Sequence, residues 1–400
     1  MFKAARDFAF PIYVRREAVT LALLVGIAIL LLLMVSGLSS VYHAQQDALS
    51  DRWAARGVDE LRAGHYRTAA DEFRTALRYS HDNFSQQLGL AEALIGMKRI
   101  PEAEVYLVTL WEQEPENGVV NRELARIAAG ENNTTRALRY YHNAIYATWP
   151  PGQENQRLET RWELIKYLLA LNARAQAQSE LIALDAEVGD NPAEQLLLGQ
   201  YFLQVGDDPH ALASFRKTLA ADPRSERALA GAGTAEFDAA NYIVARRYLR
   251  RALAEHPGNH DAAARLETTE QILRMDPFRS NLSQDQQAKA TMTAFAVAGT
   301  RLQACPAAAA TTAPAEEPST ANAAPGARQN PAAAAPPTLN DAWTRMKPLV
   351  TPRALRRNPD RVNEAMDLVF AIERQANGKC GAGTASDAAL LLIEKLHEGS

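Results

Sequence analysis

The stretch that decides the fold runs from Pro192 to Ser225 and reads PAEQLLLGQYFLQVGDDPHALASFRKTLAADPRS. Its small and large apolar residues stand at the offsets that two packed antiparallel helices require, because residues three or four apart share a helix face. The same residue types recur 34 positions further on, where Ala245 and Leu249 repeat Ala211 and Phe215. Recurrence at a fixed period of this length indicates a repeat architecture.

Six copies of this unit tile more than half of the chain. Steps of 34 residues give windows at 50–83, 84–117, 118–151, 158–191, 192–225 and 226–259, interrupted only at residues 152–157. A small residue recurs on each second helix, at Ala69, Ala103, Ala137, Ala177, Ala211 and Ala245. One helical turn later comes a large apolar residue, at Phe73, Leu107, Tyr141, Leu181, Phe215 and Leu249. The small residue lets two helices approach and the large one fills the space beside it, so the pattern predicts stacked helical pairs. The turns between paired helices are predicted at Gly64, Lys98, Asn132, Asn172, Gly206 and Ala240.

These positions make residues 50–259 similar to the tetratricopeptide repeat family. The first window follows the family pattern closely, with Trp53, Gly57, Gly64, Tyr66, Ala69, Phe73 and Ala76, as does the window at 192–225. The resemblance implies an all-α solenoid of about six helix-turn-helix repeats, whose first helices line a concave groove. Such a groove is a surface for a helix or an extended peptide.

The resemblance also implies which residues lie at the centre of the groove. In the third, fourth and fifth windows they are Arg122 and Arg126, Trp162 and Lys166, and Leu196 and Gln200. Arg and Trp are enriched at binding hot spots, so a partner with acidic and aromatic or apolar side chains is expected there. The alternative is a solvated helix face with one partly buried tryptophan. Relatives that clamp acidic chaperone tails place Lys and Asn at the positions held here by Ala54 and Val58, which disfavours that role.

A membrane anchor is predicted at residues 18–38, AVTLALLVGIAILLLLMVSGL, which carry no charge and are long enough to span a bilayer. Lys3, Arg6, Arg15 and Arg16 precede it, whereas no Lys or Arg follows until Arg52. The positive-inside rule therefore places residues 1–17 in the cytoplasm and the repeats outside it, in the periplasm if the source is a double-membrane bacterium. A cleaved signal peptide is the alternative, although its apolar core is usually shorter.

The chain beyond the repeats divides into three parts. Residues 260–305 are expected to form capping helices, including one over residues 284–304, and the Ala/Pro-rich stretch 306–338 a linker. Residues 339–400 are expected to be a helical module, either a small bundle of its own or docked on the 284–304 helix. Cys305 and Cys380 flank the linker and would pair in an oxidising compartment, closing a loop worth up to about 4 kcal/mol; two free thiols are the alternative.

Composition and motifs narrow the function. The net charge of −4 argues against a nucleic-acid-coating surface. No phosphate-binding glycine loop, haem motif or metal-ligand spacing is present, so no cofactor, metal site, small-molecule substrate or enzyme activity is predicted. The favoured function is a membrane-tethered scaffold for protein–protein interactions on the exported side, as an accessory of envelope assembly, secretion or protein maturation. The alternative is a targeting or accessory subunit of an enzyme complex, with a small functional module at 339–400.

Overall fold

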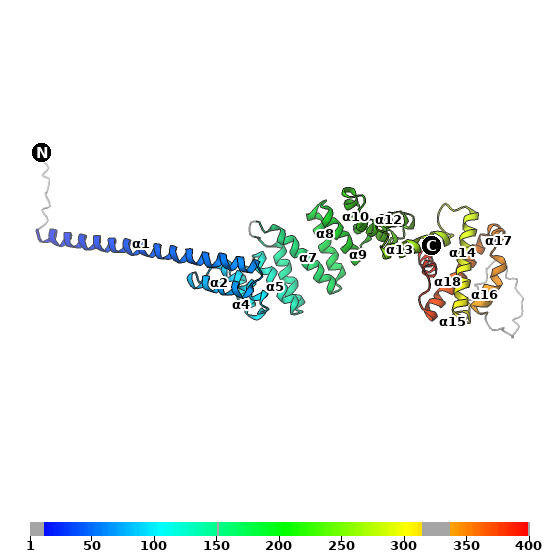
Figure 1. Ribbon diagram of the computed structural model, residues 1–400, viewed down its shortest axis with the longest axis horizontal. Helices are drawn as coiled ribbons and strands as arrows, with labels where there is room; N and C mark the ends of the chain where they lie inside the picture. The colour runs from blue at the N-terminus through cyan, green and yellow to red at the C-terminus, as the bar shows by residue number, and fades with distance from the viewer. Residues whose placement is uncertain (1–11, 150–151, 314–336, 399–400) are drawn as a thin grey trace, which may run out of the picture. The chain divides into compact units, whose positions relative to one another are not determined.

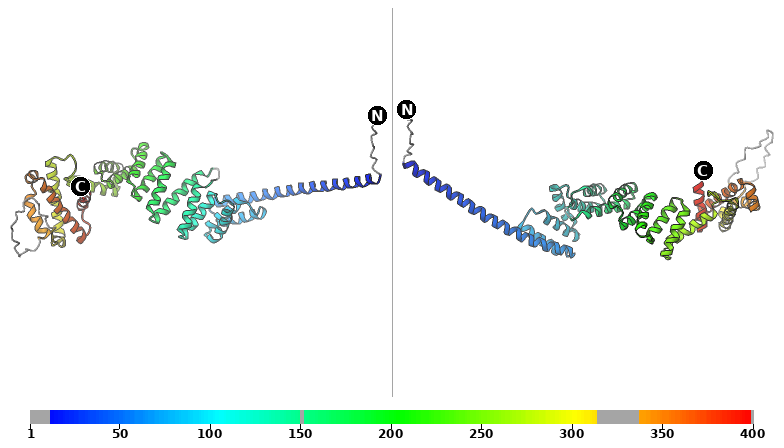
Figure 2. Two further views of the ribbon diagram at one scale, coloured as in Figure 1. Left: turned by 180° about the vertical axis from the view of Figure 1, so that it is seen from behind. Right: turned by 90° about the horizontal axis from the view of Figure 1, so that it is seen from above.

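The computed structural model describes residues 12–149, 152–313 and 337–398. Within these residues every regular element is a helix, and β-pairing is confined to two isolated bridges. The chain divides into two compact units, Met1–Leu171 and Asn172–Ser400. Each unit is a succession of antiparallel helices (Figures 1 and 2). The predicted all-α solenoid is therefore confirmed.

The first unit consists of one very long helix followed by shorter helices that pack in sequence order. Its helices are α1 (Ile12–Arg62), α2 (Tyr66–Tyr79), α3 (Phe84–Gly96), α4 (Ile100–Gln113), α5 (Gly118–Gly130), α6 (Thr134–Tyr146) and α7 (Glu154–Ala170). The end of α1 pairs with α2, α3 with α4 and α5 with α6, as the first three windows predict. The interruption expected at residues 152–157 is mostly helical, because residues 154–157 form the first turn of α7.

The predicted anchor and the first repeat belong to the same helix. α1 has 51 residues, and its apolar part is exposed, with Leu32 at 69% and Leu38 at 73%. Packing against the repeats begins at Ser50, whose hydroxyl donates to the carbonyl of Ala76 at 3.0 Å and accepts from Gln86 Nε2 at 2.7 Å. Within the described residues α1 alone is long and apolar enough to cross a membrane.

The six predicted turn residues share one backbone conformation. Gly64, Lys98, Asn132, Asn172, Gly206 and Ala240 all have φ between 55° and 83°. In five of them two hydrogen bonds close the helix end, as where Lys98 N donates to Ile95 O and Arg99 N to Leu94 O. This is the Schellman arrangement, which satisfies the carbonyl groups left at the end of a helix. Lys98 and Ala240 adopt it although a side chain in this region costs roughly 1–2 kcal/mol, so the turn is imposed by the packing of the helical pair.

The small and large residues of the repeat meet as predicted. All six recurring alanines are fully buried, and the six large residues are at most 4% exposed. The two phenylalanines among them need additional space. The ring of Phe215 lies against Gly199 and Gly231, where an added Cβ would come within 2.6 Å and 2.3 Å of it.

Phe73 repeats this arrangement between Gly57 and Gly89 in the first unit, where a Cβ would come within 3.0 Å and 2.4 Å of the ring. Both phenylalanine rings are therefore matched by glycine on the two neighbouring first helices.

The second unit continues the repeats and adds the C-terminal region. Its helices are α8 (Arg174–Val188), α9 (Pro192–Val205), α10 (Asp208–Ala221), α11 (Glu226–Asp238), α12 (Tyr242–Glu255), α13 (His260–Met275), α14 (Gln284–Ala304), α15 (Pro306–Ala309), α16 (Leu339–Met346), the 3₁₀ turn η1 (Lys347–Leu349), α17 (Pro352–Arg357), α18 (Asp360–Cys380) and α19 (Ala385–His397). The fourth window is divided between the units, since α7 ends the first unit and α8 begins the second. The helix expected over residues 284–304 is present as α14.

The C-terminal helices share one core with the capping helices. This core contains Ile272 of α13, Phe295 of α14, Leu339 of α16, Met366 of α18 and Leu390 of α19. Of the two arrangements that the sequence leaves open for residues 339–400, the structure has docking on the 284–304 helix. The physical reason is that α14 and α18 are each 21 residues long with an apolar face, which is too long for the short helices α16, α17 and α19 to cover alone.

The ends of the predicted linker are ordered, which corrects its expected bounds of 306–338. Residues 306–309 form α15, and Ala308 is fully buried beside Cys305 and Ala376. Thr312 pairs with Thr338, so the two ends of the segment lie together. Residues 314–336, the rest of the predicted linker, lie outside the described residues. Cys305 and Cys380 form a disulfide with their Cα atoms 6.1 Å apart, which ties the end of α14 to the end of α18.

Candidate functional site

The residues predicted at the centre of the groove in the first unit belong to a connected set of charged side chains. Arg126 on α5 donates from Nε and Nη2 to the carboxylate of Glu163 on α7, at 2.9 Å and 2.5 Å. Its third nitrogen, Nη1, donates to Glu123 Oε1 at 2.7 Å. The hydrogen bonds with Glu163 raise the pKa of Arg126 further above its usual value, although desolvation opposes this shift. Arg126 is therefore fully engaged within the protein.

Arg122 is buried, whereas the sequence pattern predicted an exposed groove residue. Its side chain is 10% exposed, and its Nε donates to Glu123 Oε1 at 3.3 Å. Its guanidinium lies 5.5 Å from the ring of Trp149, a distance suited to cation–π attraction. The physical reason for the burial is that Trp149 and Glu123 together supply the partners that water would otherwise supply.

Trp149 reaches Arg122 because the segment after α6 folds back onto the start of α5. The amide of Gly118 donates to Thr148 O at 3.2 Å, and the amide of Thr148 donates to Glu116 O at 3.1 Å. The indole then lies over Gly118, where an added Cβ would come within 2.5 Å of it. The sequence signal that identifies Trp149 is its offset within the repeat. In the window 118–151 it stands at the offset at which Pro223 ends the second helix of the window 192–225.

The other predicted groove residues differ in exposure. Trp162 is buried at 8% exposure, because an indole ring gains more from burial in the repeat than from lying in water. Lys166 is exposed, and no described carboxylate lies within ion-pair distance of it. In the second unit Leu196 and Gln200 are half-buried, and Gln200 Oε1 accepts from Arg227 at 3.3 Å.

A third carboxylate, Glu92 on α3, belongs to the same charged set. Burial, followed by the nearby Glu123, raises the pKa of Glu92 to about 7, against the opposing effect of Arg122 and Arg126. With Glu92 protonated, Glu123 and Glu163 balance the two arginines. The cluster formed by Glu92, Arg122, Glu123, Arg126 and Glu163, here called the charged cluster, is thus close to neutral. Among the six predicted residues, Lys166 is the cation left to meet an acidic partner.

The raised pKa of Glu92 predicts a pH dependence of stability. A carboxyl group with a higher pKa in the folded than in the unfolded chain stabilises the fold below about pH 4.5, and this contribution is lost as the pH rises toward 7. We expect Glu92→Gln to raise the free energy of unfolding by about 2–3 kcal/mol at pH 8 and to change it little at pH 4.5. Thermal unfolding followed by circular dichroism at both pH values measures this. An equal effect at the two values would contradict the buried-carboxyl explanation.

Within the described residues no group of three or more His, Cys, Asp or Glu side chains is arranged to hold a metal ion. At the predicted groove positions of the first two windows, Ala54, Val58 and Leu88 are half-buried. These residues lead along α1 and α3 to the charged cluster and Lys166.

Comparison with known proteins agrees with the repeat assignment. The tetratricopeptide repeat family profile matches residues 60–127. No curated protein matches the sequence. Among solved structures, YrrB, described as a TPR protein with an unusual peptide-binding site, is 18% identical, with 48% of this chain and 97% of that chain covered and a TM-score of 0.39.

Two further structures are similar at the same level. Pseudomonas aeruginosa pilF is 14% identical, with 55% and 97% of the two chains covered and a TM-score of 0.39. The C-terminal part of a TPR repeat-containing protein from Cytophaga hutchinsonii is 12% identical, with 62% and 95% covered and a TM-score of 0.43. The tetratricopeptide repeat profile thus matches within residues 60–127, and the six recurrent turns and buried alanines show that the same helical-pair repeat extends over residues 50–259.

Proposed function

We propose that this tetratricopeptide repeat protein is a membrane-tethered scaffold that binds protein partners on the exported side of the membrane. The observation that carries the proposal is α1, in which an exposed apolar stretch continues without a break into the first repeat. At 1.5 Å per residue, Ser50 lies roughly 18 Å along the helix from Leu38. Because the headgroup region adds only about 5–8 Å to each side of the hydrocarbon core, the repeats would begin just outside it.

Two features support the exported side, and a third, Tyr42, supports the membrane span itself. Basic residues precede the apolar stretch and none follows until Arg52, as expected when the N-terminal side is cytoplasmic. Tyr42, 60% exposed, stands four residues beyond Leu38, where aromatic side chains favour the membrane interface. The disulfide between Cys305 and Cys380 is of a kind that persists in oxidising compartments.

The groove of the first unit is the proposed contact surface. Its half-buried Val58 and Leu88 suit an apolar helix face, and Lys166 suits an acidic residue at one end of that helix. The charged cluster lies between these apolar residues and Lys166. It would favour one register of the bound helix, because a charged residue of the partner is repelled wherever it meets a residue of the same sign. Tetratricopeptide repeat proteins are in general interaction scaffolds without catalytic activity, which agrees with this function.

The proposal is tested by photo-crosslinking in intact cells. We expect a benzoylphenylalanine at Lys166 to give discrete crosslinked species, because this exposed position belongs to the proposed contact surface. These species should remain in the membrane after alkaline carbonate extraction and be digested by protease added to the exported side of sealed membranes. The matched control places the same group at Arg67, an exposed residue on α2 outside the predicted groove.

Each arm of this experiment has an outcome that counts against the proposal. Equal crosslinking from both positions would reject the groove as the contact surface. Protection from exported-side protease would reject the orientation, and release by carbonate together with loss of an N-terminal tag would show cleavage of the anchor.

A further inference from the structure

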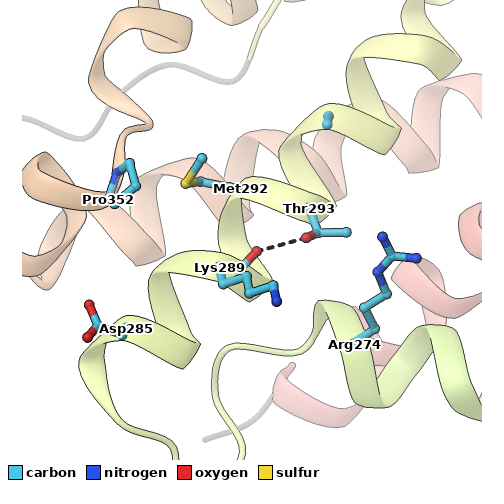
Figure 3. Close-up of a pocket in the computed structure, with 7 residues that line it drawn as sticks. Arg274, Asp285, Lys289, Met292, Thr293 and Pro352 are labelled. Atoms are coloured by element: carbon cyan, nitrogen blue, oxygen red, sulfur yellow. Dashed lines mark hydrogen bonds between the residues drawn. The ribbon is translucent and has the colours of Figure 1, made fainter.

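A cleft in the second unit combines apolar side chains with cations that have no partner. It lies between α13, α14 and α17 and has a volume of about 530 Å³, within the range of about 300–1,000 Å³ that is usual for ligand pockets. Met292 and Ala296 of α14 and Pro352 of α17 form its apolar surface, and Arg274 of α13 and Lys289 of α14 extend into the same space (Figure 3).

Some polar side chains of the cleft already have a hydrogen-bond or ion-pair partner within the protein, and others do not. Thr293 Oγ1 donates to the carbonyl of Lys289 at 2.8 Å, so this hydroxyl is satisfied within α14. Asp285 is bound by Arg356 Nη1 at 2.7 Å. Among the described residues no carboxylate lies within ion-pair distance of Arg274 or Lys289, and both are exposed. Two cations are therefore available beside an apolar surface.

The chain around this cleft is basic, although the protein as a whole carries a net charge of −4. The segment 345–361 contains Arg345, Lys347, Arg353, Arg356, Arg357 and Arg361 against a single acidic residue, Asp360. Arg353 and Arg357 of α17 are exposed and have no acidic partner among the described residues. This local excess of positive charge is a signal that the repeat pattern does not reveal, because the segment lies outside the repeats.

We propose that this basic cleft binds an acidic peptide segment of a partner protein. Carboxylates of the segment would pair with Arg274 and Lys289, and an apolar side chain between them would pack on Met292 and Pro352. A membrane surface is less suited to the cleft, because lipid headgroups supply the charge but not an apolar side chain at the same depth. The inference goes beyond the proposed function, since it assigns a second contact surface outside the groove.

The experiment measures binding of a fluorescent peptide with the sequence Glu-Leu-Glu-Glu-Leu-Glu to the full-length protein in detergent, by fluorescence anisotropy at low salt. We expect Arg274→Glu combined with Lys289→Glu to weaken binding about tenfold, because two attractive pairs become repulsive. The matched control, Arg67→Glu with Arg78→Glu, changes the net charge equally at two exposed residues of α2 and should keep the affinity. A peptide with serine in place of both leucines should also bind more weakly. Circular dichroism shows whether each variant is folded.

Four outcomes would overturn the proposal. They are no binding by the unaltered protein, equal weakening in the two charge variants, equal affinity for the serine-containing peptide, and cleft-dependent binding of phosphatidylglycerol from mixed detergent micelles in place of the peptide. The first three reject a specific peptide cleft, and the fourth assigns the basic surface to lipid. The two charge variants leave every predicted groove residue unchanged, so loss of binding in the Arg274 and Lys289 variant alone assigns the peptide to the cleft and not to the groove, whatever the orientation of α1.

Discussion

Phe215→Ala is expected to lower the free energy of unfolding of the second unit by about 3–5 kcal/mol. The ring is fully buried and fills the space between α9 and α11 that Gly199 and Gly231 leave open. Neither glycine has a side chain that could move into the cavity, so the surroundings collapse poorly. Urea unfolding of the full-length protein, with hydrogen exchange resolving α9 to α11, measures the loss.

A double-mutant cycle tests whether the loss comes from the contact between Phe215 and Gly231. The alternative is that any substitution in these helices lowers the free energy of unfolding. Gly231→Ala places a methyl group within about 2.3 Å of the Phe215 ring and should destabilise, although alanine favours a helix by about 1 kcal/mol over glycine. Phe215→Leu in the same chain should relieve most of that cost. The repeats with leucine at this position support the expectation, because Leu107 and Leu181 are followed 16 residues later by Glu123 and Leu197 rather than glycine. Simple additivity of the two single changes would contradict the contact.

Loss of the disulfide is the second large expected effect. Cys305→Ser with Cys380→Ser should lower the free energy of unfolding of the C-terminal region by about 4 kcal/mol in the chain-entropy model, because the bond closes a loop over a sequence separation of 75. Urea unfolding of the unaltered protein with and without reductant measures the same loss. The reductant should have no effect on the double variant, which serves as the control.

Hydrogen bonds near the disulfide join the same segments of the chain. They determine how much of the local structure remains when the bond is absent. Lys379 Nζ donates to Ala307 O at 3.2 Å and to Thr311 Oγ1 at 2.8 Å, and Arg301 donates to the carbonyl of Gly381. We therefore expect the double variant to fold, with hydrogen exchange increased at α15 and at the end of α18. Two alkylatable thiols in the unreduced protein, with no mobility change on reduction, would show that the bond does not form.

The predicted groove residues show which properties of a site the sequence does not predict, namely burial and the partners supplied by other helices. The 34-residue phase indicates which residues share a helix face, and it locates Lys166 and Arg126 on an exposed one. It does not indicate depth, because Arg122 is buried by a contact with Trp149, a residue 27 positions away. The neutralisation of Arg126 likewise depends on Glu163 from the next first helix. A pattern of residue types along one helix contains no information about which residues of the next element meet it.

The basic cleft was inaccessible to the same reasoning for a related reason. Arg274, Lys289 and Pro352 belong to three helices that lie outside the 34-residue repeat pattern. Their meeting depends on the docking of the C-terminal helices on α14, which the sequence leaves open.

The sequence by itself determined the repeat, because each repeat is held by contacts between residues that are close along the chain. The buried Ala211 and Phe215 and the left-handed turns at Lys98 and Ala240 follow from the spacing of one helical pair. Only the tertiary structure decided the burial of Arg122 and Trp162, the docking of residues 339–398 and the pairing of Cys305 with Cys380. These depend on which distant surfaces meet, and apolar burial, being non-directional, does not specify a partner in the sequence.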